Sequence, residues 1–224
     1  MGPPMKRFVI MAVLGAALAA CSHTSQTAQP GAQTTAASPA PAATNTLDFP
    51  VYDGSTVLVA QPWHQSVGGH MVGGTEVIAQ TPATLAQLGD WIHGLAAKPP
   101  AGYTVAATGS GVEIAKRRAA AMGIDFEAFT HDVKGTKRAL VVIAIDPKNF
   151  EAKAGPVLAM IGKYKMLPQS LRDPIDAQAK ARTGYTVSEA LDPATPLGAA
   201  IVAVDKLKDT GERGVLLLDG AKTP

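Results

Sequence analysis

The residues that follow Cys21 most constrain the fold, because they separate a part that cannot form a core from a part that can. Residues 22–46 consist mainly of Ser, Thr, Ala, Gln, Pro and Gly, with no Asp, Glu, Lys, Arg or large apolar side chain. Such a segment buries too little apolar surface to offset the entropy lost on ordering. We therefore expect a disordered spacer here and a folded domain beyond it.

The residues before the spacer have the pattern of an export signal. Lys6 and Arg7 precede an uncharged run of 13 residues, Phe8–Ala20. This run is shorter than the roughly 20 apolar residues of a transmembrane helix, and its length and flank are typical of a secretory signal peptide. It ends at Leu18-Ala19-Ala20-Cys21, which holds the only cysteine of the chain.

The sequence Leu18-Ala19-Ala20-Cys21 resembles the lipobox of bacterial lipoproteins, in which an aliphatic and two small residues precede an obligatory cysteine. The resemblance implies that residues 1–20 are removed, that the Cys21 thiol receives a diacylglyceryl group, and that the new amino terminus is acylated. Two or three acyl chains anchor a protein stably, whereas one does not. Ser22, where inner-membrane lipoproteins tend to have Asp, favours the periplasmic face of an outer membrane. The alternative is a secreted protein with an unrelated cysteine.

Residues 21–47 are then expected to be a lipidated cysteine with a linker. A flexible linker of this length reaches roughly 25–30 Å, so its expected role is to space the domain from the membrane. A binding or glycosylation segment is the alternative. Without Lys6 and Arg7, the 20 basic residues become 18 and equal the 18 acidic ones. The pI of 8.6 is therefore no indication of a nucleic-acid partner, which would require a concentrated basic face.

Residues 48–224 have the composition of a globular domain. Their number suffices for one core, or for two lobes, 48–147 and 148–224, that share one. The chain enters this domain through a turn at Asp53-Gly54. The stretch Pro50-Val51-Tyr52-Asp53-Gly54 resembles the Pro-x-Tyr-x-Gly turn that opens uncharacterised bacterial lipoprotein domains, and this resemblance carries no known active site.

The first half of the domain is predicted to contain strands around one clear helix. Strands are expected over 56–60 and 75–80, with the glycine-rich residues 63–74 as a loop or loose hairpin. Thr81 as N-cap and Pro82 at the first helical position predict a helix that ends before Pro99-Pro100. Its apolar stripe consists of Leu85, Leu88, Trp91, Ile92 and Leu95.

We next expect a strand over 102–105 and a helix over 112–122 that is closed by Gly123. Two further strands are expected over 124–133 and 138–145. The last two strands are joined at residues 134–137 as a hairpin.

The second half is predicted to contain helices at 156–167 and from Asp173, with Pro174 at its start, to Gly184. A hairpin of strands over 200–204 and 214–218 follows, with a turn near 210–212. The alternative is a helix over 196–208 capped by Thr195, because Leu197, Ile201, Val204 and Lys208 have helical spacing.

Gly184-Tyr185-Thr186-Val187 repeats Gly102-Tyr103-Thr104-Val105 after 82 positions. The repeat indicates two similar helix–strand–hairpin units, with chance recurrence as the alternative. Helices interleaved with adjacent strand pairs predict an α+β fold whose sheet is mostly antiparallel.

Histidines are the first candidates for metal ligands. His64, His70 and Met71 lie in or beside the glycine-rich segment, but two histidines at this spacing are not a recognised metal site and no cysteine remains to join them. His93 is expected on the polar face of a helix and His131 in a strand. We predict no metal and no cofactor.

Nucleotide and catalytic motifs are incomplete. Gly109-Ser110-Gly111 lacks the third glycine of a dinucleotide fingerprint, because Ile114 stands there, and Gly162-Lys163 lacks the flanks of a P-loop. The sequence contains no Gly-x-Ser-x-Gly and no Ser-x-x-Lys motif. We therefore assign no catalytic residue, and Cys21 is the single predicted modification site.

A basic patch is one further hypothesis. Anionic lipid head groups would be attracted to six basic residues if these gathered on one face. They are Lys116, Arg117 and Arg118, expected on a helix, and Lys134, Lys137 and Arg138, which are nearby in the chain. The alternative is an ordinary solvated surface.

These observations favour a non-enzymatic lipoprotein that displays an α+β domain to a protein or an envelope polymer. The alternatives are an exported hydrolase with an unrecognised site and a carrier of a small apolar ligand.

Overall fold

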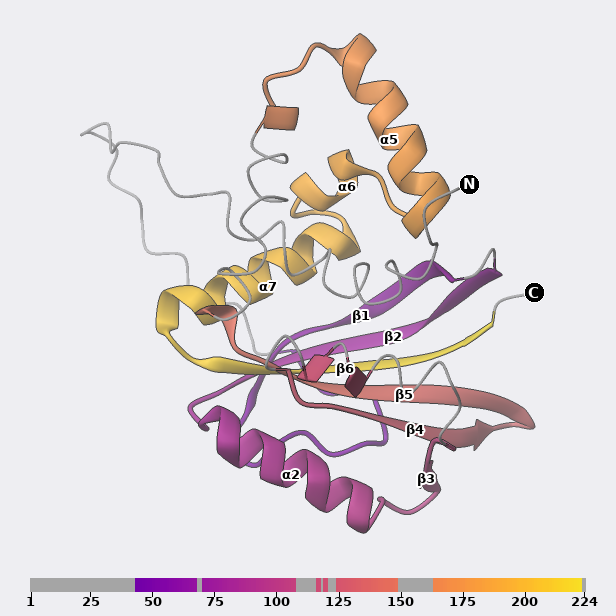
Figure 1. The fold of residues 1–224 in the computed structure, drawn as a ribbon, viewed down its shortest axis with the longest axis vertical. Coiled ribbons are helices and arrows are strands. Elements are labelled where there is room, and N and C mark those ends of the chain that lie inside the picture. Colours follow the sequence, from indigo (N-terminus) through magenta and orange to yellow (C-terminus); the bar gives the residue numbers. More distant parts are fainter. Residues whose placement is uncertain are drawn as a thin grey trace.

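The computed structural model describes residues 43–67, 70–107, 116–117, 119–120, 124–148 and 163–222. These residues form an antiparallel sheet of six strands with helices on both of its faces (Figure 1). The predicted α+β class with an antiparallel sheet is confirmed.

The strand order is β1-β2-β6-β5-β4-β3. The strands are β1 (Thr56–Val67), β2 (His70–Thr81), β3 (Tyr103–Val105), β4 (Phe126–Val133), β5 (Thr136–Ile145) and β6 (Arg213–Lys222). The helices are α2 (Leu85–Ala97), α5 (Gln169–Thr183), α6 (Val187–Leu191) and α7 (Pro196–Thr210).

Strand β6 lies at the centre of the sheet and separates two apolar layers. Its side chains alternate between the faces. Val215 and Leu217 join the core beneath α2, whereas Leu216 and Leu218 join the core beneath α7. All four are at most 7% exposed. We call the two sides of the sheet the α2 face and the α7 face.

The two candidate lobes share this one sheet. Strands β2 and β5 come from residues 48–147, and β6, from residues 148–224, pairs with both of them. The second half of the chain thus completes the sheet of the first half.

The hairpin of β1 and β2 is longer than predicted. Its strands pair from Thr56↔Gln80 to Val67↔His70, through the glycine-rich segment, with an irregularity between Val57 and Val59. At one position the sheet requires a glycine. A side chain at Gly74 would collide with the carbonyl oxygen of Asp219.

Helix α2 has the predicted apolar stripe but a different start. Leu88 and Ile92 are fully buried, and the other members of the stripe pack against the same core. Thr81 ends β2, and Thr84 is the N-cap. The reason is a capping box, in which Thr84 Oγ1 accepts from the Gln87 N–H at 3.2 Å and Gln87 Oε1 accepts from the Thr84 N–H at 2.8 Å.

The end of the predicted linker already belongs to the domain. Ala43 and Leu47 pack against the α2-face core. Asn45 Nδ2 donates to the Phe49 carbonyl at 2.8 Å. The ring of Phe49 lies edge-on to Tyr103, with the ring centres 4.9 Å apart.

The hairpin of β4 and β5 is confirmed. Its turn places Lys134 and Gly135 at φ 53° and 82°. The short strand β3 is also confirmed, at the edge beside β4. Of the helix predicted over 112–122, residues 116, 117, 119 and 120 are helical and the others lie outside the described residues. Of the helix predicted over 156–167, residues 156–162 lie outside them as well, 163 and 164 are helical, and 165–167 form a turn and a bend, so the predicted end is wrong.

The prediction that Asp173 begins a helix is wrong. Helix α5 starts at Gln169, so Pro174 lies inside it, while Gly184 ends it in the left-handed conformation as predicted. Pro174 has no N–H to donate to the Ser170 carbonyl. Because Ser170 is exposed, solvent can replace that donor.

The predicted duplication is also wrong. Residues 103–105 form a strand, whereas Thr186 caps the short helix α6 through a capping box with Glu189. The same four-residue sequence therefore forms an edge strand in the first half of the domain and the start of a helix in the second half.

The predicted strand over 200–204 is wrong, and the alternative helix is correct. Thr195 caps α7, Pro196 is its first residue and Gly211 ends it. Ala200, Ile201, Ala203, Val204 and Leu207 are buried against the α7 face. Since β6 already has β2 and β5 as neighbours, these residues cover the sheet instead of extending it.

The packing at the start of α7 can be tested by substituting Gly198, with Gly94 of α2 as the control. A Cβ on Gly198 would lie 1.8 Å from the Asp192 carbonyl oxygen, whereas a Cβ on Gly94 in α2 would meet nothing within 4 Å. We predict that Gly94→Ala stabilises the protein by about 0.5–1 kcal/mol. Gly198→Ala should destabilise it by about 1–3 kcal/mol, because the backbone must shift. Urea unfolding measures both changes, and a shift of the same sign in the two variants would contradict this packing.

Candidate functional site

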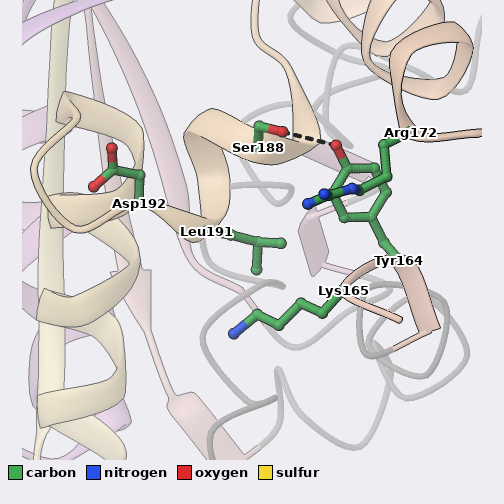
Figure 2. Close-up of a pocket in the computed structure, with 6 residues that line it drawn as sticks. All are labelled: Tyr164, Lys165, Arg172, Ser188, Leu191 and Asp192. Carbon is green, nitrogen blue, oxygen red and sulfur yellow. Dashed lines mark hydrogen bonds between the residues drawn. The ribbon is translucent and has the colours of Figure 1, made fainter. Parts of the chain in front are cut away.

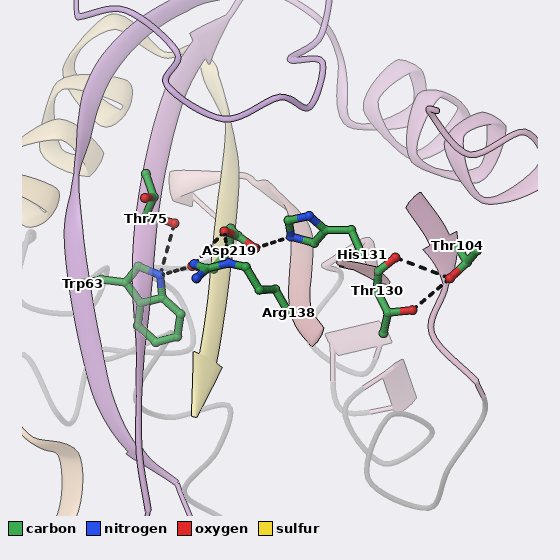
Figure 3. A network of polar contacts seen from close by, with 7 residues as sticks. All are labelled: Trp63, Thr75, Thr104, Thr130, His131, Arg138 and Asp219. Atoms are coloured by element: carbon green, nitrogen blue, oxygen red, sulfur yellow. Dashed lines mark hydrogen bonds and ion pairs between the residues drawn. The ribbon is translucent and has the colours of Figure 1, made fainter. Parts of the chain in front are cut away.

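A buried ion network lies where the apolar run of β6 ends (Figure 3). Asp219 Oδ1 is 2.6 Å from His131 Nε2, and Asp219 Oδ2 accepts from Arg138 Nε at 2.8 Å. A second nitrogen of Arg138 lies 2.7 Å from the same oxygen. Asp219 is only 5% exposed. The network joins β4, β5 and β6 at one level of the sheet.

Two aromatic side chains contact members of this network. The ring of Tyr103 stacks on His131, with the centres 4.5 Å apart. The indole N–H of Trp63 donates to the carbonyl oxygens of Thr75 and Asp219 at 3.1 and 3.0 Å. Gly220 leaves room for this indole, because a Cβ there would lie 2.7 Å from it.

The contacts of the network hold three strands together. A histidine–aspartate pair serves catalysis when the histidine also reaches a nucleophile. The hydroxyls of Thr104 and Thr130, on the strands beside His131, bond to each other at 2.9 Å (Figure 3). Both carboxylate oxygens of Asp219 are used to hold neighbouring strands.

We predict that Asp219→Asn destabilises the protein by about 3 kcal/mol, because it leaves Arg138 without its buried counter-charge. Asp90→Asn, on the exposed side of α2, is the matched control and should change stability by less than about 0.5 kcal/mol. Denaturant unfolding compares the two. Equal losses of unfolding free energy in the two variants would show that the network stabilises the fold no more than an exposed carboxylate does.

A second polar cluster protects the edge strand β1. The His64 N–H donates to Tyr185 Oη at 2.8 Å, and the two rings lie 4.3 Å apart. Gln61 Nε2 donates to the Pro196 carbonyl at 2.6 Å and to Glu76 Oε2 at 3.0 Å. An exposed edge strand can pair with other chains, and these contacts cover it.

Glu76 is a buried carboxyl in this cluster, with 8% of its surface exposed. Burial raises the pKa of Glu76, and the hydrogen bond from Gln61 opposes this effect. Burial likewise raises the pKa of Tyr185; its bond with His64 lowers it, and the charges of Glu76 and Glu189 raise it further. The folded state thus favours the protonated form of Glu76 more than the unfolded chain does.

A raised pKa makes stability depend on pH. The favourable contribution of Glu76 is complete below its ordinary pKa of 4.5 and is lost as the pH rises through the higher folded value. We predict that Glu76→Gln gains stability relative to the unchanged protein between pH 4 and pH 7. Unfolding at both pH values measures this gain, with Asp209→Asn as control, and a difference independent of pH would contradict it.

The structure has a pocket of about 320 Å³ beside α5 and α6 (Figure 2). Its lining consists of Tyr164, Lys165, Arg172, Ser188, Leu191 and Asp192. Arg172 comes from α5, Ser188 and Leu191 from α6, and the other three from the adjoining segments. The guanidinium of Arg172 lies over the Tyr164 ring, 6.0 Å from its centre.

Asp176 bonds to two residues of the pocket lining, Tyr164 and Ser188. Its Oδ2 accepts from Tyr164 Oη at 2.7 Å and from Ser188 Oγ at 2.6 Å, while Oδ1 accepts from the Val187 and Ser188 N–H groups at 2.8 and 3.2 Å. Burial acts to raise the pKa of Asp176, but the bonds from Ser188, Tyr164 and Val187 outweigh it and lower the pKa. A carboxylate with a lowered pKa is a poor base for activating serine. Asp176 therefore holds α5 and α6 together.

The candidate residues from the sequence do not gather at one site. His64 Nε2 lies 3.3 Å from the Gly184 carbonyl oxygen, and the side chain of His70 lies outside the described residues. His93 is exposed on α2, and His131 lies in β4, both as predicted. Within the described ranges, no group of three or more His, Cys, Asp or Glu is placed to hold a metal ion. Cys21, Gly109-Ser110-Gly111 and Gly162 lie outside these ranges.

The basic patch is divided by ion pairs. Lys116 Nζ lies 2.7 Å from Glu127 Oε1, and Arg138 belongs to the Asp219 network. The side chain of Arg118 lies outside the described residues. These two cations are therefore matched by carboxylates and do not add to a continuous positive surface.

The pocket residues were not predicted from the sequence. Thr186-x-x-Glu189 is a capping-box pattern, and it would have located the start of α6 and with it Ser188. Tyr164, Arg172 and Asp176 have no motif that marks them, because tertiary contacts bring them together.

Comparison with protein-family models, with curated proteins and with solved structures finds no match for this chain. Among the described residues, no helix has the length and apolar character needed to cross a membrane. The functional argument therefore depends on the chain's own residues.

Proposed function

We propose that this protein is a lipoprotein of the cell envelope that is anchored through Cys21 and displays its α+β domain to a protein or envelope polymer. The sequence Leu18-Ala19-Ala20-Cys21 carries the proposal. The only thiol of the chain stands where lipid attachment requires it, directly after an apolar run too short to span a bilayer. We place the anchor on the periplasmic face of the outer membrane where two membranes exist.

The arrangement of the chain supports the display of a domain. Within the described residues, Ala43 is the first to pack against the core, and about twenty residues separate it from Cys21. A flexible linker of that length reaches roughly 25 Å. The mature chain has equal numbers of acidic and basic residues, so its net charge does not hold the domain against anionic lipid.

The described polar clusters support a binding role over a catalytic one. His131 and Asp219 hold strands, His64 covers an edge strand, and Asp176 joins two helices. The pocket beside α5 has charged and hydroxyl groups in its lining. This composition suits a polar partner better than the apolar ligand of a carrier.

We predict that Cys21→Ala abolishes lipid attachment. The unchanged protein, expressed in a bacterium fed labelled palmitate, should carry the label and sediment with membranes, because its acyl chains insert into lipid. The Cys21→Ala variant should lack the label and either become soluble or keep its signal peptide, as intact mass would show. Ser25→Ala, in the linker, should behave like the unchanged protein. A Cys21→Ala variant with undiminished label and membrane binding would refute the anchor.

The display role needs a separate experiment. Crosslinking in cells, followed by mass spectrometry, should join lysines of the domain to another envelope protein or to envelope polymer. The Cys21→Ala variant should lose these crosslinks, because it is no longer held near its partner. Crosslinks confined to the chain itself would argue against display.

A further inference from the structure

The pocket beside α5 and α6 contains an arginine with a hydrogen-bond donor that has no acceptor. Arg172 Nε is buried and has no hydrogen-bond partner. A buried donor without a partner is unfavourable, because it has lost its bond to water and gained none in exchange, so such a group in a pocket indicates a missing acceptor. In Figure 2 the guanidinium extends from the Tyr164 ring toward Leu191.

The nearby carboxylates are engaged by other groups. Asp176 accepts from Tyr164, Ser188 and Val187. Asp173 accepts from the Gln169 side chain at 2.5 Å, and Asp192 accepts from the Ala194 N–H at 2.9 Å. The ion pairs identified in the described residues involve neither Arg172 nor Lys165. Both cations therefore remain available to a ligand in the pocket.

From this geometry we infer that the pocket binds the acidic group, a carboxylate or a phosphate, of a small polar molecule. Guanidinium groups bind both kinds of oxyanion through paired hydrogen bonds. The Lys165 ammonium adds a second positive charge. Leu191 and the Tyr164 ring form an apolar wall for the carbon skeleton.

The size of the pocket limits the ligand. About 320 Å³ is at the lower end of ligand pockets, which span roughly 300–1,000 Å³. A single sugar acid or sugar phosphate suits this volume. The inference goes beyond the lipid anchor and is independent of it, because the lining residues all lie between 164 and 192.

Three probes on one scaffold test the inference. Glucose, glucuronate and glucose 6-phosphate differ in whether they carry no acid, a carboxylate or a phosphate. We would titrate each into the purified full chain in detergent and follow the amide and arginine side-chain NMR signals. At least one acidic probe should bind saturably with a Kd of about 1 mM or tighter, whereas glucose should not. The acid that binds identifies the kind of group recognised.

Variants locate the binding. Arg172→Gln and Lys165→Gln should each weaken it about tenfold or more, because each removes a charged hydrogen-bond donor. Lys180→Gln changes an exposed cation on the same helix and should leave binding unchanged. Lys165 lies in an exposed turn, so its variant keeps the test valid if Arg172→Gln perturbs the fold.

Two results overturn the inference. The first is the absence of saturable binding by both acidic probes, or equal binding of glucose. The second is binding that Lys165→Gln and Lys180→Gln weaken to the same extent, since this would mark a diffuse charge effect.

Discussion

Strand β6 is the element on which the remaining structure depends, because it must be buried on both faces. Val215 and Leu217 need the layer of α2, and Leu216 and Leu218 need the layer of α7. The sheet is therefore complete only when residues near the C-terminus lie between β2 and β5. One strand thus links the packing of both halves of the chain, and it explains why the two candidate lobes share a single sheet.

Beyond Leu218, the buried side chains of β6 are no longer apolar, and the next one is the carboxylate of Asp219. Asp219 holds His131 and Arg138, and the Trp63 indole lies against Gly220. Buried ion pairs seldom add much net stability, but breaking one is costly. This network therefore penalises a shifted register of β4, β5 and β6, since a slip of one residue would turn Asp219 to the other face.

The region of α5 and α6 is held in a different way. Its main links are hydrogen bonds to Asp176 and contacts of Tyr185 with β1. Leu171 and Ile175 of α5 are exposed, at 53% and 39%. This region also contains the pocket with Arg172 and Lys165, which we infer to bind an acidic ligand. The proposed anchor would present this region to the envelope.

The sequence by itself determined the elements whose signals are local. The stripe of α2, the hairpin of β4 and β5, and the glycine that ends α5 depend on near neighbours; the lipobox prediction has the same local character. The run 200–204 suits a strand or a helix equally, so the occupied neighbours of β6 decided for α7. The pocket was likewise decided by tertiary structure. Tyr164, Arg172 and Ser188 are separated in the chain, and the contacts that join them arise only when α5 and α6 pack together.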